Sequence, residues 1–433
     1  MRIVAGKENV VVQGMRPEEN WWGKYQFPIP YKLYDRIAVS VHVEDDTIIA
    51  TGNPTRWFES FDNGESWRET DAENAAKFGL LLKNGDRIYF PKEGGTDVSG
   101  YKFPARGALT PEYDFNKKAA EGEMPFADGV TAWWTGSVIE AYNADRLPES
   151  LSKKEWHIER IPAGQTEPIK ETVPLKWDYL TRVVFNRKKM KPINPRGNPK
   201  LAPDGSIWIS AFSGEGHLNP ENGLYSPYYS AEIFVSRDNG HSFEHHAHME
   251  YPADGKKYPY LSGGFSDSDF EFLDDGSIIW FMRSAWMGST GFEWAPMYVS
   301  RSRDGGKTWS EPEIYADCGV FPRMCKLDCG VILLCYARPG MYVDALDSRT
   351  GEKIVSICLM EKKDRSYLAN EKIETPTWHQ WDGQCGNPEI IPLDSNSALL
   401  FYGDFYYPDE NGIKRKSILC KKIRVTVPIQ ITP

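Results

Sequence analysis

Short apolar runs separated by tight polar turns recur along the chain. Each unit joins two apolar runs through a turn of a few polar residues, a pattern typical of a β-hairpin. Six hairpins are expected, with turns at 44–46, 83–86, 203–205, 274–276, 328–330 and 394–396. Long amphipathic runs are missing from the sequence and 30 prolines would interrupt helices, so the pattern predicts an all-β protein.

A second pattern, Ser-x-Asp-x-Gly-x-x-aromatic, occurs at 60–67, 236–243 and 302–309. The Ser and Asp side chains can bond backbone amides inside such a turn, and the glycine supplies a conformation that a Cβ would obstruct. Combined with the hairpins, it indicates a repeated unit of four short antiparallel strands. This predicts a β-propeller of six blades, or seven if Asp128-Gly129 begins a further blade.

The repeat covers the whole chain, so residues 1–433 are expected to form one propeller domain. The second unit is long and predicts an insertion through 92–128. After the sixth hairpin one clear strand remains. A strand at 9–13 is therefore expected to complete the last blade.

Composition narrows the class of partner. The formal charge of −10 argues against nucleic acid, and a membrane span is not expected, since we find no apolar stretch near 18 residues. Residues 1–8 lack the apolar core of a secretory signal, which predicts a cytoplasmic protein, or a secreted or periplasmic one if a signal has been removed. The seven cysteines are interpreted as core thiols. No cofactor is predicted, and oligomeric state is left open.

The repeated hairpins and Ser-x-Asp turns, known as Asp boxes, resemble the sialidase (neuraminidase) superfamily over nearly the whole chain. The resemblance implies that the turns are structural and that a site lies at the opposite end of the blades. Sialidases hold the substrate carboxylate with three arginines. By resemblance these are Arg36, in a Tyr-Asp-Arg-Ile-Ala segment, then Arg283, and either Arg323 or Arg338.

The catalytic positions of the family match less well. Its glutamate position falls on 264–269, which offers Asp267 or Asp269. Its tyrosine position falls on 382–389, which contains no tyrosine but provides Asn387 as a binding candidate and Glu389 as a catalytic one. The place of its general acid holds no carboxylate before Glu59. Ordinary sialidase activity is therefore in doubt.

Other residues offer different chemistry. Glu215 and His217 lie on a Gly-rich segment after a predicted strand, where either could act as acid or base. Tyr342 is one of several aromatic residues placed to stack on a sugar ring. Four histidines between 241 and 248 surround a Ser-x-Asp turn and are interpreted as structural, so no metal site is predicted.

These features predict an exo-acting glycoside hydrolase of sialidase-like fold that acts on an acidic, carboxylate-bearing sugar or on a plant-type glycan, with an oligosaccharide or glycan as its partner. One alternative is a polysaccharide lyase that acts on a uronate with His217 and a tyrosine. The other is a non-catalytic glycan-binding propeller.

Overall fold

The computed structural model describes most of the chain. The described residues are 1–16, 19, 23–43, 55–71, 75–91, 94–103, 129–132, 138–193, 195, 198–212, 217–218, 225–226, 229–251, 264–285, 296–317, 319–337, 340–360 and 385–426. Their regular secondary structure is almost entirely β-strand, with short helical turns such as α2 (Glu149–Ser152). Within these residues, no helix is long and apolar enough to cross a membrane.

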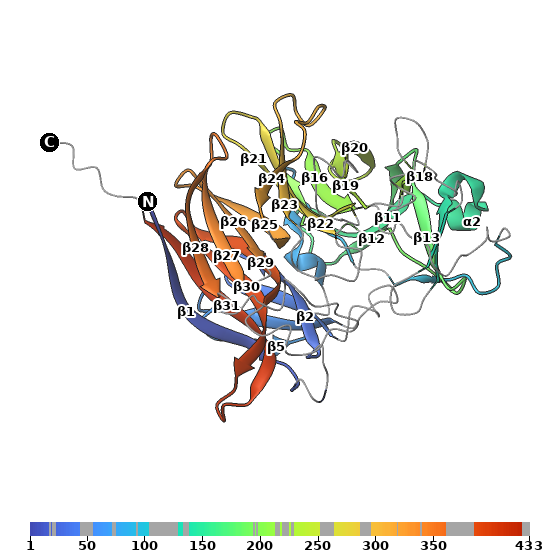
Figure 1. Cartoon of the computed structure of the whole chain (residues 1–433). Helices are drawn as coiled ribbons and strands as arrows, with labels where there is room; N and C mark the ends of the chain where they lie inside the picture. Colours follow the sequence, from blue (N-terminus) through green and yellow to red (C-terminus); the bar gives the residue numbers. More distant parts are fainter. Residues whose placement is uncertain are drawn as a thin grey trace.

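Most strands form four-stranded antiparallel groups that follow chain order (Figure 1). In three groups the strands follow one another in chain order. The first contains β2 (Tyr25–Lys32), β3 (Ile37–Val43), β4 (Thr55–Ser60) and β5 (Arg68–Thr70), and the second contains β21 (Gly264–Phe272), β22 (Ile278–Ala285), β23 (Met297–Ser302) and β24 (Glu313–Ala316). The third contains β25 (Val320–Leu327), β26 (Val331–Ala337), β27 (Met341–Asp347) and β28 (Lys353–Met360). Another joins β29 (Cys385–Asp394), β30 (Ser397–Pro408) and β31 (Lys414–Thr426) to β1 (Arg2–Gln13). The chain's first strand thus pairs with its last.

An eight-stranded sheet contains two further antiparallel groups of four. They comprise β6 (Leu80–Leu81), β7 (Arg87–Tyr89), β11 (Glu155–Ile161) and β12 (Ile169–Lys176), and β15 (Lys200–Leu201), β16 (Ile207–Phe212), β19 (Ser230–Ser236) and β20 (Phe243–Glu250). A short parallel pairing between β12 and β20 joins the two groups.

A separate five-stranded sheet draws only β8 (Thr96–Asp97) from the segment 92–128 that was expected to be an insertion, and its other four strands lie further along the chain. These four strands of the sheet are β9 (Gly129–Ala132), β10 (Val138–Asn143), β13 (Thr181–Phe185) and β14 (Lys189–Met190). Its β13 and the adjacent helix α2 lie on the side of the molecule away from β1 and β28 (Figure 1).

Consecutive four-stranded groups pack face to face through aromatic and aliphatic side chains. Trp57 stacks on Phe78 at a ring distance of 5.0 Å, and Trp156 lies 5.2 Å from Phe234. Later groups share buried clusters of Leu, Ile, Val and Met, and the last group packs against the first through residues such as Val39 and Phe401. Apolar burial between groups is therefore the main force that orders them.

The three Ser-x-Asp turns close themselves by local hydrogen bonds. In the first, Ser60 Oγ accepts from the Gly64 amide at 2.8 Å, and Asp62 Oδ1 accepts from the amides of Glu65 and Ser66 at 3.1 and 2.9 Å. The turns around Asp238 and Asp304 repeat the arrangement. Each turn follows the third strand of its group. We refer to this end of the strands as the turn end.

Five of the six predicted hairpins are confirmed by strand pairing. The first was wrong. β3 pairs with β2 on one side and with β4 on the other, so no edge remains for the predicted partner at 47–50. The first hairpin turn is instead at 33–36, where the Leu33 amide donates to the Arg36 carbonyl. Residues 44–54 lie outside the described part of the chain.

Candidate functional site

Four first strands carry the same irregularity near their beginning. In β2, β21, β25 and β29 the pairing register shifts, and one non-glycine residue has a positive φ. These residues are Phe27 (50°), Asp267 (27°), Phe321 (53°) and Asn387 (52°). Such a conformation costs about 1–3 kcal/mol for each residue and concentrates at functional sites. We refer to this end of the strands as the bulge end.

Side chains from β2, β22 and β25 meet around the ring of Phe321. The ring of Phe27 lies 5.7 Å from it, centre to centre. The guanidinium carbons of Arg283 and Arg323 lie 5.8 and 5.7 Å from the same ring centre. We call Phe27, Asp267, Arg283, Phe321, Arg323, Asn387 and Glu389 the bulge cluster.

Each arginine of the bulge cluster is ion-paired within it. Arg283 Nη1 donates to Asp267 Oδ2 at 2.8 Å, and Arg323 Nε donates to Glu389 Oε1 at 2.7 Å. The second oxygen of Glu389 accepts from Asn198 Nδ2 at 3.2 Å. Although burial opposes the charge of Arg323, the neighbouring Glu389 and Asp269 raise its pKa above the ordinary value. The positive charge of the cluster is thus largely compensated by its own carboxylates.

Two buried polar atoms of the cluster have no hydrogen-bond partner among the described residues. They are Asn387 Oδ1 and Arg283 Nε. Buried polar groups in folded proteins are nearly always satisfied, so these two atoms mark places where a ligand, solvent or a residue outside the described part of the chain can bind. An acceptor and a donor beside an aromatic ring can recognise a sugar hydroxyl and its ring face.

Asp269, the other carboxylate predicted for catalysis, serves the interior instead. Its Oδ2 accepts from the Met324 amide at 2.7 Å and from Lys200 Nζ at 3.1 Å. Lys200 is buried, which lowers its pKa, but Asp269 and Glu271 outweigh the burial and raise it. Asp269 therefore links β21 to β25 and holds a buried lysine, which leaves it little capacity for substrate.

The structure corrects the prediction for Arg36, which lies at the turn end. It directly precedes Ile37, which pairs with Ser60 of the first Ser-x-Asp turn. Its guanidinium bonds Glu59 at 3.1 Å and lies 4.9 Å from the Phe61 ring. Arg283 is at the other end of its sheet, since it is Ile278 of the same strand that pairs with the turn residue Ser302. The error follows from the misplaced first hairpin.

Four other predicted residues are Arg338, Glu215, His217 and Tyr342. Arg338 and Glu215 lie outside the described residues. His217 lies in β17 (His217–Leu218), which pairs with β18 (Tyr225–Ser226), and its side chain is not described. Tyr342 stacks on Tyr336 of the neighbouring strand, with ring centres 5.1 Å apart. Roles for these residues remain predictions.

Sequence reasoning missed Phe27, Phe321, Asn198 and Lys200. One signal could have found the first two. A bulge residue directly followed by proline begins three of the strands, as Phe27-Pro28, Phe321-Pro322 and Asn387-Pro388. Because proline cannot donate to a ladder, it is tolerated in a strand mainly at edges and bulges. Asn198 and Lys200 gave no comparable signal.

No family model and no curated protein matches the sequence. A crystal structure of a protein of unknown function from Dyadobacter fermentans DSM 18053 is similar at 16% identity and a TM-score of 0.56, over 98% of this chain and 99% of that one. This similarity shows a shared fold.

Two solved glycosidases are also similar. They are the NanB sialidase from Streptococcus pneumoniae (12% identity, 96% of this chain and 70% of that one, TM-score 0.43) and the GH93 α-L-arabinofuranosidase of Fusarium graminearum (11%, 96% and 97%, TM-score 0.42). Similarities with such low identities and TM-scores do not support any statement about the function of this chain.

Proposed function

We propose that the chain is a carbohydrate-active six-bladed β-propeller, and that it is a glycoside hydrolase with its site at the bulge cluster. The six-bladed assignment is supported by groups of four strands in chain order, by packing between consecutive groups and by contact of the last group with the first. Pairing of β1 with β31 supports one domain, since it joins the two ends of the chain in one sheet.

The observation that carries the proposal is the meeting of open polar atoms, an aromatic ring and carboxylates. Asn387 Oδ1 and Arg283 Nε offer an acceptor and a donor, while Phe321 offers an apolar face. Side chains of this composition suit sugars, whose faces are apolar and whose edges carry hydroxyls. The strained backbone beneath these side chains is consistent with selection for function rather than stability.

The charges favour a neutral sugar over the acidic one expected from the sequence. Of the expected arginines, Arg36 is at the turn end, while Arg283 and Arg323 already hold Asp267 and Glu389. An anionic substrate would have to compete with these carboxylates for the charge of the arginines. A neutral glycan can bind without that cost.

Glu389 is the leading candidate for nucleophile or general base. Its oxygens are held by Arg323 and Asn198, which fixes the carboxylate in place. Asp267 is the second carboxylate, since glycoside hydrolysis usually needs a pair. Glu215 stays a candidate for the proton donor.

A non-catalytic glycan-binding propeller is the second candidate. It is favoured by the pairing of both cluster carboxylates with arginine, because neither is then an evident proton donor. No contact in the described residues favours the lyase, whose proposed base is His217.

Turnover of neutral aryl glycosides, uronides and sialosides tests the proposal. We expect release of a neutral sugar, with Glu389→Gln reducing kcat by about 10²–10⁴-fold. Arg36→Ala is the matched control and should leave turnover unchanged. An unsaturated product would instead indicate a lyase. Binding without any product would favour the non-catalytic binding propeller. The absence of both binding and product would refute a sugar site.

A further inference from the structure

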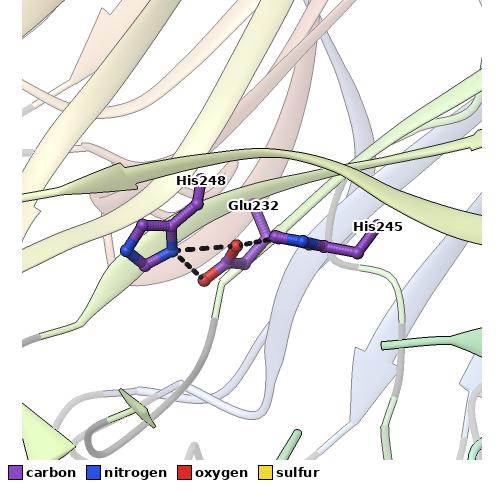
Figure 2. Close-up of side chains that lie close together, drawn as sticks. All are labelled: Glu232, His245 and His248. Carbon is purple, nitrogen blue, oxygen red and sulfur yellow. Dashed lines mark hydrogen bonds and ion pairs between the residues drawn. The ribbon is translucent and has the colours of Figure 1, made fainter. Parts of the chain in front are cut away.

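Outside the bulge cluster, three ligating side chains meet on the last two strands of one group. Glu232 of β19 faces His245 and His248 of β20 (Figure 2). A carboxylate oxygen of Glu232 lies 2.6 Å from His245 Nε2, and the other lies 3.0 Å from His248 Nδ1. One ligand atom from each residue falls within 4.8 Å of the others.

A β-bulge brings the two histidines to one face. Residues three apart on a regular strand point to opposite faces. Here Ile233 pairs with Ala247 while Phe234 pairs with His245, so His246 is the extra residue of the bulge. His245 is thereby turned to the face that His248 and Glu232 share. His246 bonds the Gly305 carbonyl instead, at 2.9 Å. Such bulges often serve to re-aim a functional side chain.

Nearby side chains hold Glu232 and His245 in place. Ser230 Oγ donates to Glu232 Oε1, and the ring of Trp177 lies parallel to that of His245 at 5.8 Å. The side chain of Glu232 is 2% exposed, while those of His245 and His248 are 18% and 14% exposed. The carboxylate is therefore oriented and buried, and the imidazoles are reachable from solvent. Oriented ligands with outer hydrogen bonds are characteristic of metal sites.

We propose that Glu232, His245 and His248 bind one divalent transition-metal ion, with Zn²⁺ the best fit. Two imidazoles and one carboxylate form a donor set that zinc proteins use, with a fourth position left for water. A tetrahedral zinc ion holds neighbouring ligand atoms about 3.3 Å apart, so small side-chain rotations from the hydrogen-bonded arrangement admit it. Soft metal ions prefer cysteine thiolates, and Ca²⁺ prefers six to eight oxygen ligands, so this set of two imidazoles and one carboxylate suits neither.

The ion would crosslink two strands at the place where two four-stranded groups join. It would link β19 to β20, and β20 itself joins the preceding group through Leu175 and Phe243. Trp177 comes from that preceding group and covers one of the ligands. Binding to the folded state alone would raise stability by mass action.

Metal content measured by mass spectrometry tests the proposal. The full chain is stripped with a chelator, dialysed against Zn²⁺ and analysed for bound metal, with about one ion per chain expected. The double variant His245→Gln/His248→Gln should bind zinc about 100-fold more weakly or not at all. The control is His241→Ala, which changes an exposed histidine in the Ser-x-Asp turn just before β20 and should bind zinc as the wild type does. No zinc in the wild type, or equal zinc in the double variant, overturns the proposal.

Cobalt substitution gives a test that needs no variant. Co²⁺ bound to the wild-type chain should show the strong visible bands of a tetrahedral site, and added Zn²⁺ should abolish them. Only the weak absorption of hydrated Co²⁺ would overturn the proposal. Unchanged circular dichroism of the variants in metal-free buffer would show that loss of zinc is not loss of fold.

Discussion

The turn end and the bulge end of the same strands are stabilised in different ways. At the turn end, Ser60 and Asp62 satisfy amides no more than four residues away. At the bulge end, Arg323 pairs with Glu389, 66 residues further along the chain, and Phe27 packs on Phe321. One end is built from local contacts and the other from contacts between groups.

The backbone shows the same contrast. At the turn end the positive φ angles fall on the fourth and fifth residues of the first turn, Asn63 and Gly64, which are residue types that tolerate them. At the bulge end Phe27 and Phe321 adopt it, although a bulky residue there is strained. We interpret the turns as serving stability and the strained bulges as serving the proposed site.

The largest expected effect is at the bulge end. Arg323→Ala leaves Glu389 buried without its cation, which should cost about 3–5 kcal/mol in the free energy of unfolding. Arg36→Ala, at the turn end, should cost about 1 kcal/mol or less because that guanidinium is partly exposed. Urea unfolding measures both. Equal losses would erase the contrast, whereas recovery in Arg323→Met/Glu389→Leu would confirm its electrostatic origin.

At the turn end, adding a Cβ should be costly. Gly306 has φ +78°, and a Cβ there would come within 3.0 Å of His246 Nε2 and of the Trp208 ring. Gly306→Ala should therefore lower the free energy of unfolding by about 1–3 kcal/mol. Its neighbour Gly305 has φ +72° but open space around it, so the loss of stability in Gly305→Ala measures the cost of the backbone conformation alone. Thermal unfolding of both variants separates strain from crowding, and equal losses would exclude a crowding term.

These differences also explain what the sequence could predict. Five hairpins and the Ser-x-Asp turns are encoded within a few residues, and apolar alternation is enough to find them. The first hairpin failed because 44–46 holds three acidic residues and looked like a turn, whereas the true turn at 33–36 includes the apolar Leu33. Arg36 was misplaced as a consequence.

The site was only partly predictable. Asp267, Arg283, Arg323, Asn387 and Glu389 were found by family resemblance, but their mutual pairing depends on contacts between groups. Asn198 meets Glu389 across 191 residues, which no local pattern encodes. The pair of histidines that faces Glu232 depends on a register shift that periodicity alone does not reveal.

A smaller effect concerns acid stability at the turn end. Hydrogen bonds from Ser66 and from Thr308 lower the pKa of Asp62 and of Asp304 to about 2, from an ordinary 3.8. Because the folded-state pKa is below the unfolded one, the stability is present above about pH 4 and is lost as the pH falls toward about 2. Urea unfolding across this range should show the loss, and Asp62→Asn/Asp304→Asn should flatten it. An unflattened profile would place the acid sensitivity elsewhere.

The smallest effect on stability should have the opposite sign and the clearest consequence for binding. Asn387→Gly removes a Cβ from a residue with φ 52°, so relief of strain should raise the free energy of unfolding by about 0.5–1 kcal/mol. It also removes the open Oδ1 acceptor, so glycan affinity should fall by about tenfold. Asn387→Ala keeps the strain and loses the same acceptor. Calorimetry should therefore show equal loss of binding in the two variants, and only the glycine variant should unfold at a higher temperature. If Asn387→Gly were both less stable and fully able to bind, this bulge would be a structural feature like the turns.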